Sequence, residues 1–495
     1  MYRSTKLLVL ACVGILLLTI GNAQTGLGTP TVVNDIHSQL NATTVDRIEK
    51  PKSIEAIQEI IKKAKAQGKS VSITGGRHAM GGQQFGTGTI LIDMSSMNRV
   101  LSLDAERGVI EVEAGIQWPE LVDYLIRTQK GKKKQWGIIQ KQTGADRLSL
   151  GGALSANVHG RGLRLKPIVG DVESFLLVDA DGNIKRCSRT ENPELFRLTI
   201  GGYGLFGVIA SIKLRLEPRT KLERVVEIIP IEDLMESFDK RIAEGFRYGD
   251  WQYSTDVDSK DFLKKGVFSC YRPLPEDAPM PQEIKELSVD DWKDLLYLAH
   301  ADKKKAFDRY SSYYLTTSGQ KYWSDTHQLG VYIDNYHKEL DEKLGAKNKA
   351  TEMITEIYVP RTSLANFMED TRKYLRENQV NVIYGTIRLI EKDDESFLAW
   401  ARESWACIIF NLHVVHGEEG LKQAERDFRA LIDLGNKYGG SYFPTYHRWA
   451  TRQQVETSHP RFAEFLKLKL KFDPEERFQS EWYRHYKKMF ADVLK

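Results

Sequence analysis

Cysteine is scarce in this chain, which has four cysteines among 495 residues. Cys12 lies in an apolar run near the N-terminus, and the other three, Cys187, Cys270 and Cys407, are far apart in the sequence. At most one pair of these three could form a disulfide bond. A disulfide-stapled scaffold is therefore excluded, and core packing must hold the fold together.

Net charge is also small. The chain has 71 basic and 67 acidic residues, which leaves +4, and its one obvious basic cluster, residues 130–134, is short. This balance gives little electrostatic support for a nucleic-acid partner, so we expect none. The Walker, G-x-S-x-G and C-x-x-C patterns are absent as well. These absences exclude the commonest signatures of nucleotide hydrolysis, serine hydrolysis and dithiol chemistry.

The N-terminal apolar run is short for a membrane span. Arg3 and Lys6 precede the run, residues 7–20, and small residues follow it up to Ala23. This pattern is typical of a secretory signal peptide over residues 1–23, cut after Ala23. The sequence therefore predicts a secreted or periplasmic protein. A retained membrane anchor is the weaker alternative.

The block that follows mixes helix and strand signals. Ser53 can cap a helix that ends at Gly68, and a short strand over residues 71–73 comes next. Runs rich in β-branched residues continue to residue 113, and an Asp181-Gly182 turn separates two further strands. Residues 208–218 alternate apolar and more polar side chains before Pro218. The sequence predicts an α+β domain that closes near residue 218.

Three glycine-rich segments lie in this block: "TGGRHAMGGQQ" at 74–84, "SLGGALSANVHGRG" at 149–162 and "GGYGLFGVI" at 201–209. The last one fits the dinucleotide pattern G-x-G-x-x-G, but a strand rather than a helix is expected after it, which argues against a Rossmann site. The alternative is that loops from separate strands approach one large anionic ligand with their backbone N–H groups.

In this order, the glycine segments together with "VDADGNI" and "ENPELFRLTIGGYGLFGVI" resemble the FAD-binding domain of the vanillyl-alcohol oxidase and p-cresol methylhydroxylase (PCMH) superfamily. Single motifs are most similar to those of decaprenylphosphoryl-ribose oxidases, cytokinin dehydrogenases, and sugar-lactone or alditol oxidases. The resemblance implies an α+β, two-domain flavoprotein: a PCMH-type FAD-binding domain at 38–218, an α+β substrate (cap) domain at 219–440, and a C-terminal segment at 441–495 that returns to the flavin.

The resemblance also implies which residues contact FAD. In the covalent branch of the superfamily the position of His78 is bonded to the flavin 8α-methyl group, and the alternative is a histidine that only contacts the cofactor. The expected FAD-binding residues are Thr74, Gly75, Gly76, Arg77, His78, Gln83, Gly144, Ser149, Gly151, Gly152, Ser155, Asn157, His159 and Ile209.

For catalysis, the returning tail supplies Tyr446 and His447, which we expect to face His159 and Arg388. Alditol oxidases place a glutamate two positions before the arginine, where this chain has Thr386, so a polyol-binding carboxylate is in doubt at that position.

Cytokinin dehydrogenases carry a catalytic aspartate at the position of Gly144, and its absence argues against amine oxidation. Asp146 lies close enough in the sequence to keep that alternative open. His413 and His416 lack a third ligand at convincing spacing, so no metal site is predicted.

The chemistry that follows is hydride transfer from an alcohol C–H bond of a sugar-like small molecule to flavin N5. The alternatives are an amine or lactone dehydrogenase of the same superfamily, or a flavin-binding module without turnover. The electron acceptor is expected to be oxygen or a quinone or other carrier, and contact with a membrane is expected only if the N-terminal segment is retained.

Overall fold

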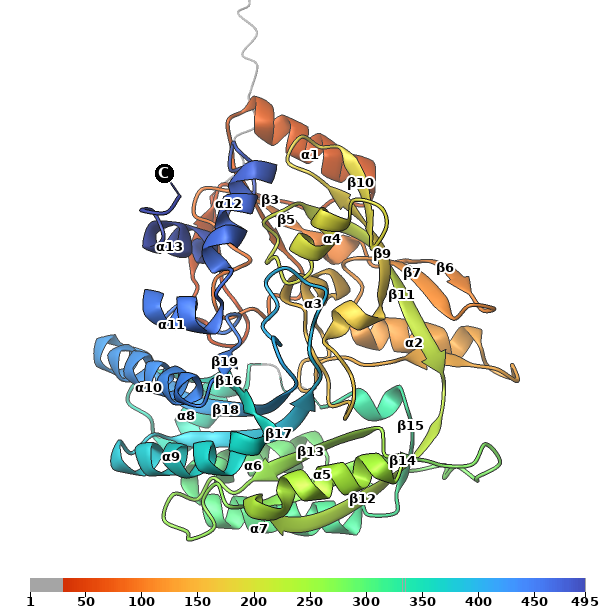
Figure 1. Cartoon of the computed structure of the whole chain (residues 1–495), viewed down its shortest axis with the longest axis vertical. Helices are drawn as coiled ribbons and strands as arrows, with labels where there is room; N and C mark the ends of the chain where they lie inside the picture. The colour runs from red at the N-terminus through yellow and green to blue at the C-terminus, as the bar shows by residue number, and fades with distance from the viewer. Residues whose placement is uncertain (1–29, 332, 334, 495) are drawn as a thin grey trace, which may run out of the picture.

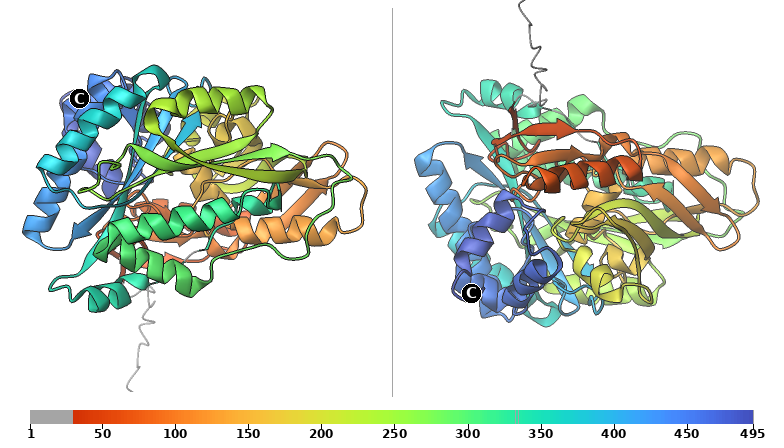
Figure 2. Two further views of the ribbon diagram at one scale, coloured as in Figure 1. Left: turned by 90° about the horizontal axis from the view of Figure 1, so that it is seen from below. Right: turned by 90° about the horizontal axis from the view of Figure 1, so that it is seen from above.

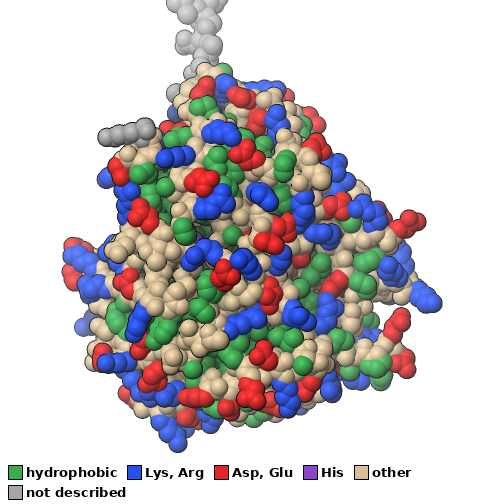
Figure 3. Space-filling view, viewed as in Figure 1, with side chains coloured by type: hydrophobic (Ala, Val, Ile, Leu, Met, Phe, Trp, Pro, Cys, Tyr) green, Lys and Arg blue, Asp and Glu red, His purple; other side chains and the backbone are tan. Residues whose placement is uncertain are grey.

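The computed structural model describes residues 30–331, 333 and 335–494 (Figure 1). The predicted signal peptide, residues 1–23, lies outside the described residues. Within the described part, no helix combines the length and the apolar character that crossing a membrane requires. On the face seen in Figure 3, acidic and basic side chains are interspersed, as the balanced composition suggests.

A three-stranded parallel sheet begins the fold. Its order is β3 (Arg47–Glu49), β5 (Ile90–Asp93), β4 (Val71–Thr74). Helix α1 (Ile54–Ala66) connects β3 to β4 and buries Ile57, Ile61 and Ala64, as the spacing of its apolar residues predicts. The Ser53 side chain caps this helix by accepting a hydrogen bond from the backbone N–H of Ala56. Strands β1 (Thr31–Val33) and β2 (Thr43–Val45) form a small separate pair.

The second sheet is antiparallel and completes the flavin half. Its order is β10 (Ile184–Ser188), β9 (Val172–Val178), β11 (Val208–Pro218), β7 (Val109–Glu113), β6 (Val100–Asp104), and β8 (Trp136–Ile138) also pairs with β11. Three helices accompany it: α2 (Trp118–Thr128), α3 (Leu150–Ala156) and α4 (Pro193–Thr199). The "GGYGLFG" segment leads into β11, so the expectation that a strand follows it is confirmed.

The chain changes sheet after Pro218. An eight-stranded antiparallel sheet then runs β15 (Lys321–Trp323), β12 (Lys221–Pro230), β14 (Lys265–Pro273), β13 (Tyr248–Tyr253), β17 (Val382–Ile390), β18 (Trp405–Val415), β16 (Ala350–Pro360), β19 (Ser441–Tyr442). Figure 2 shows helices on both faces of this sheet. They are α5 (Leu234–Ala243), α6 (Val289–Ala301), α7 (Lys303–Thr316), α8 (Tyr336–Leu344), α9 (Leu364–Glu377) and α10 (Glu418–Lys437).

The tail crosses back to the flavin half through α11 (Arg452–Ser458), α12 (Phe462–Phe472) and α13 (Glu481–Met489). In Figure 1, α11 lies near α10 and α12 lies near β3. Phe478 forms a parallel bridge with Val71, and the backbone N–H of Glu481 donates to the Phe85 carbonyl over 2.7 Å. The C-terminal segment therefore connects the cap sheet with the first glycine segment.

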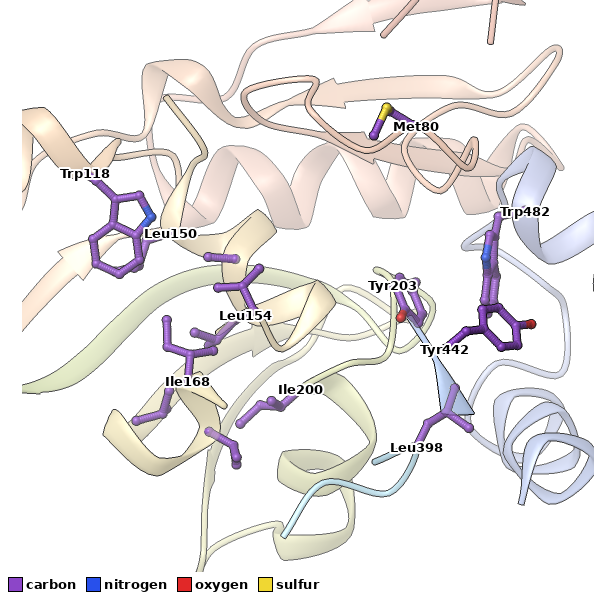
Figure 4. Close-up of a cluster of buried hydrophobic side chains, with 14 of the residues drawn as sticks. Met80, Trp118, Leu150, Leu154, Ile168, Ile200, Tyr203, Leu398, Tyr442 and Trp482 are labelled. Atoms are coloured by element: carbon purple, nitrogen blue, oxygen red, sulfur yellow. The ribbon is translucent and has the colours of Figure 1, made fainter. Parts of the chain in front are cut away.

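One apolar core is continuous across these regions. Figure 4 shows Tyr203 of the third glycine segment beside Tyr442 of β19 and Trp482 of α13. The Tyr203 and Trp482 rings lie 4.6 Å apart. Cys187, Cys270 and Cys407 are buried and free, so no disulfide joins the described residues. Packing and hydrogen bonds, rather than disulfides, hold the walls of the space between the two halves in place.

Candidate active site

A cavity of about 1010 Å³ separates the flavin half from the cap sheet. One wall consists of the glycine segments and the loop around Gly144, and the other of side chains from β13, β16, β17, β18 and the start of the tail. The volume is at the upper end of ordinary ligand sites, which suits an extended cofactor together with a small substrate. The cavity therefore sits where the sequence places the junction between cofactor and substrate.

The structure brings nearly all of the predicted FAD-binding residues to this cavity. Those that line it are Thr74, Gly75, Gly76, Arg77, His78, Gln83, Gly144, Ser149, Gly151, Gly152, Ser155, His159 and Ile209. Asn157 does not line it: the side chain is fully buried, donates to Asp393 Oδ2 over 2.8 Å and accepts from the Val169 N–H over 3.1 Å. Asn157 holds the end of α3 in place.

The sequence suggests that the second glycine segment is a loop, but residues 150–156 form helix α3. Ser149 starts this helix by accepting the Gly152 N–H over 3.3 Å. A Cβ atom on Gly75 or Gly76 would collide with Ser149 or with the Arg147 carbonyl, so these glycines let the first and second segments pack together. At Gly152, by contrast, a Cβ atom would meet only Ser149 Oγ, at 3.1 Å, and would otherwise enter the cavity.

Polar side chains of this wall are mostly bonded to the protein itself. Thr74 donates to Gln84 over 3.2 Å, Ser155 donates to the Gly151 carbonyl over 2.8 Å, and Gln83 donates to the Thr445 carbonyl of the tail over 2.8 Å. What the wall presents to a ligand is therefore backbone and open space over glycine. Such a surface fits a cofactor whose phosphates are bound by main-chain N–H groups.

His78 has a second histidine beside it. His37 Nε2 lies 2.7 Å from His78 Nδ1, and both rings line the cavity. Burial, together with the nearby His37, lowers the pKa of His78 to about 3, and burial lowers the pKa of His37 to about 4. Both imidazoles are therefore neutral near pH 7. His37 lies in a segment without glycine motifs, so nothing in the sequence pointed to it.

On the opposite wall, Glu356 of β16 is the centre of a hydrogen-bond network that sequence reasoning missed. Its Oε2 lies 2.8 Å from His159 Nε2 and accepts from the Tyr358 hydroxyl over 2.7 Å, while Oε1 accepts from the Tyr446 hydroxyl over 2.7 Å. Burial alone would raise the carboxyl pKa, but the His159 charge and the hydrogen bonds from His159, Tyr446 and Tyr358 outweigh burial and lower the pKa to about 2. Glu356 is an ionised, strongly bonded group. The sequence signal was weak, because Glu356 is one of two glutamates in a strand that also contains two threonines.

Arg388 of β17 lines the cavity two strands from Glu356. The side chain is buried, forms no ion pair with any carboxylate among the described residues, and its Nε has no hydrogen-bond partner there. A buried guanidinium without an acceptor is costly, so this group favours a ligand that offers an oxygen.

The strand register accounts for the missing glutamate at Thr386. Thr386 of β17 and Glu356 of β16 both pair with Ile409 of β18, so the three residues form one row across the sheet. Neighbouring strands are about 4.8 Å apart, which places the two backbone positions roughly 10 Å from each other. The cavity therefore has a carboxylate in the expected row, but two strands away from the expected position.

Of the four predicted catalytic residues, the structure brings Tyr446, His159 and Arg388 to the cavity but not His447. His447 packs against Phe428 and Trp449, accepts the Trp449 N–H over 3.3 Å, and burial lowers its pKa to about 3. Burial, then the Glu356 charge, raises the Tyr446 pKa well above its usual value, so the hydroxyl is a donor to Glu356.

Asp146, the residue that kept amine oxidation open, does not line the cavity. Its carboxylate lies 2.6 Å from Lys141 Nζ and accepts the Gly330 N–H over 2.8 Å. Asp146 therefore does not present its carboxylate to the cavity.

The spacing argument at His413 and His416 considered only neighbours in the sequence, and in the fold His413 lies beside His300 and Glu352. His413 Nδ1 and His300 Nε2 lie 3.3 and 3.2 Å from the same oxygen of Glu352. The three groups come from β18, α6 and β16, and a spacing rule along the sequence does not detect partners on distant elements.

Comparison with known proteins gives two family matches on this chain. Residues 45–188 match a family described as FAD binding domain, and residues 333–486 match the D-arabinono-1,4-lactone oxidase family. The chain is 28% identical to L-gulonolactone oxidase of Bos taurus over 42% of this chain and 46% of that protein, about half of the relative's length. It is 21% identical to L-gulono-1,4-lactone dehydrogenase of Mycobacterium tuberculosis over 88% of this chain and 95% of that protein. A third relative is the mitochondrial L-galactono-1,4-lactone dehydrogenase of Arabidopsis thaliana, to which the chain is 23% identical over 61% of this chain and 51% of that protein.

The chain thus combines a PCMH-type FAD-binding domain with a domain of the D-arabinono-1,4-lactone oxidase family, and FAD is its cofactor. The two-domain α+β fold and the resemblance to the superfamily are confirmed. The residues at the glycine wall fit the cofactor, since Gly152 leaves room there and the neutral His78 faces the same space.

Proposed function

We propose that the protein is an FAD-dependent oxidoreductase that oxidises the hydroxyl group next to the carbonyl of a small sugar lactone. The relatives named above are lactone oxidases and dehydrogenases, which favours the lactone alternative over a general sugar alcohol. The observation that carries the proposal is the buried Arg388, without a carboxylate partner among the described residues, on the same wall of the cavity as the Glu356 network and two strands from it. A neutral lactone offers a carbonyl oxygen to Arg388 and a hydroxyl hydrogen to Glu356.

FAD, when bound, supplies the acceptor for the hydride that leaves the hydroxyl-bearing carbon. Glu356 Oε1 accepts one hydrogen bond from Tyr446, which leaves it a lone pair for the substrate hydroxyl. The hydroxyl proton passes to Glu356 as the carbonyl forms. His159, which is hydrogen-bonded to the other carboxylate oxygen, Oε2, holds Glu356 in place. Arg388 holds the lactone carbonyl and stabilises negative charge on the substrate oxygens. One hydride and one proton leave the alcohol, so a keto-lactone results.

We further propose that FAD is linked covalently through His78. A link to the flavin 8α-methyl carbon requires an unprotonated ring nitrogen, and the low pKa of His78 keeps the ring neutral. The hydrogen bond with His37 fixes the orientation of the ring.

The test is anaerobic reduction of the purified flavoprotein. L-gulono-1,4-lactone or D-arabinono-1,4-lactone should bleach the flavin absorbance, while the open-chain acids, an alditol and an amine should not. Bleaching by alditols or amines alone would refute the lactone proposal, and an unreduced flavin with every compound would favour the flavin-binding module. Reoxidation of the bleached protein by oxygen or by a soluble quinone then identifies the electron acceptor.

Export is a separate proposal, based on the signal pattern in residues 1–23. N-terminal sequencing of the protein recovered from its native host should begin at Gln24. A chain that retains residues 1–23 in the membrane fraction would show an anchor instead.

A further inference from the structure

A cluster of three histidines surrounds Glu352, near one end of β16. His300 comes from the last turn of α6, His337 from α8 and His413 from β18. The nearest ring nitrogens of these residues lie 3.2, 3.2 and 3.3 Å from the Glu352 carboxylate. Helix α6, the consecutive elements α8 and β16, and strand β18 therefore converge on one carboxylate.

These contacts are not all hydrogen bonds. His300 Nε2 and His337 Nδ1 are buried and have no hydrogen-bond partner among the described residues, although both atoms lie close to Glu352. The exposed fractions of the two side chains are 4% and 8%. Buried polar atoms of native proteins nearly always have a partner, so two ring nitrogens aimed at the same carboxylate need another explanation.

Charge balance limits the alternatives. Glu352 carries one negative charge and also accepts a hydrogen bond from the Tyr336 hydroxyl over 2.5 Å. A single carboxylate can neutralise only one positive charge, and a ring nitrogen that carries no proton offers a lone pair to a ligand. Neutral imidazole and carboxylate are the ligands that first-row divalent metal ions take in proteins.

The spacing also fits. Zn²⁺ binds imidazole nitrogen and carboxylate oxygen at about 2.0–2.2 Å, so two ligand atoms of a tetrahedral site lie about 3.3–3.5 Å apart. The nitrogen-to-oxygen distances of 3.2 and 3.3 Å for His300 and His413 are close to this value, and the ligand atoms of His300, His413 and Glu352 all lie within 4.8 Å of one another.

We propose that His300, His413 and Glu352 bind a divalent transition-metal ion of the Zn²⁺ type, with His337 beside the remaining position. Such an ion would join α6 to β16 and β18. Helices α6 and α7 supply Leu295, Leu296 and Tyr310 to the cavity wall. Glu352 itself lines the cavity four residues from Glu356, or about 13 Å along the strand. The metal ion thus has a structural role: it fixes α6 to the sheet on the substrate side of the cavity and lies apart from the redox centre.

The experiment measures how much zinc the purified flavoprotein, with its FAD bound, takes up and retains. The protein is stripped with a chelator, dialysed against Zn²⁺ and then against metal-free buffer, and analysed for zinc by mass spectrometry. We expect about one equivalent of zinc, and a melting temperature several degrees above that of the stripped protein. Zinc content should fall at least tenfold in Glu352→Gln and His413→Gln. His485→Gln, on α13, is the matched control and should bind zinc as the unmodified protein does.

Two outcomes would overturn the proposal. One is zinc at the level of the buffer blank in the unmodified protein, which would make the cluster an ion-pair network. The other is zinc that remains in His413→Gln and disappears in Cys407→Ala, which would place the ion at His159, Glu356 and Cys407, the other group of side chains close enough to hold a metal. His413 is the most exposed of the three histidine side chains, so its variant is the least disruptive, and FAD content and circular dichroism report whether each variant is folded.

Discussion

The two walls of the cavity are built from different materials. On the flavin side, glycines and backbone face the space, and the polar side chains bond to one another or to the tail. On the cap side, charged and aromatic side chains face the space among apolar ones, and these include Glu356, Arg388 and Tyr446. The flavin wall is suited to bind by shape, and the cap wall to place charge beside a reacting group. Substitutions on the two walls should therefore fail in different ways.

The largest effect is expected on the flavin wall. In Gly152→Val the new side chain enters the cavity where the cofactor lies, so the variant should fold but retain less than about a tenth of its FAD. The ratio of flavin to protein absorbance measures this. Gly170→Val, where a Cβ atom meets only Lys166 at 3.6 Å, is the control and should keep its flavin. Full FAD content in Gly152→Val would remove α3 from the cofactor site.

On the cap wall, Arg388→Met should spare the cofactor and impair the reaction. Loss of the positive charge should lower the rate of flavin reduction by lactone roughly 10²–10³-fold, because charge on the substrate oxygens is no longer stabilised. Rapid-mixing absorbance measures the rate, and Arg388→Lys should recover part of it. Loss of FAD with an unchanged rate per bound flavin would show that Arg388 belongs to the cofactor wall.

Substitutions of Glu356 and Tyr446 should slow flavin reduction by different factors. Glu356→Gln removes the proposed proton acceptor and should slow flavin reduction about 10²-fold, whereas Tyr446→Phe removes one donor to that acceptor and should slow it about tenfold. Equal losses in both variants would instead make the Tyr446 hydroxyl the acceptor.

Glu356→Gln should also change the response to acid. The folded pKa of about 2 lies below the ordinary value of 4.5, so the stabilisation from ionised Glu356 is complete above about pH 4.5 and is lost as the pH falls toward 2. Unfolding curves of the Gln variant should lack this part of the pH dependence.

His78→Ala should have a smaller effect. Acid precipitation of the unmodified protein should leave the yellow flavin in the pellet, whereas the variant should release its flavin to the supernatant. Before precipitation, the variant should still oxidise the substrate, but more slowly than the unmodified protein. Flavin that leaves the unmodified protein entirely would make His78 a contact rather than a link.

The smallest kinetic effect is expected at His447, which lies outside the cavity. His447→Gln should change the rate of flavin reduction less than about threefold, since the ring contacts neither wall. Because burial lowers the His447 pKa from 6.5 to about 3, the unfolded chain binds a proton there that the folded chain does not, and stability falls as the pH drops from 6.5 toward 3. Melting temperatures at pH 7 and pH 5 should therefore differ less in the variant. A large loss of rate would return His447 to the catalytic residues.

The contrast between the walls also explains what the sequence could predict. The glycine segments, α1 and the strands up to β11 follow local rules of capping, alternation and turn geometry. The resemblance of the glycine segments to the flavoprotein superfamily then placed His78, Gly152 and Ile209 at the cofactor site, and all three line the cavity. Glu356 and Glu352 meet their partners only through the pairing of β16 with β18 and the packing of α6, which no local pattern encodes. Asn157 and His447 were assigned to the site by their motifs, but their side chains point into the protein interior. The helix at α3 was missed because its small residues are typical of a glycine loop.

The most direct test compares two substrates that differ by one oxygen atom. Under anaerobic conditions, a sugar 1,4-lactone with a hydroxyl group beside its carbonyl is mixed with the flavoprotein, and its analogue lacking that hydroxyl is mixed in parallel. The account predicts complete bleaching of the flavin by the first lactone, none by the second, and bleaching at least about a hundredfold slower in Arg388→Met. Equal bleaching by both lactones, or none by either, would contradict lactone oxidation between the two walls.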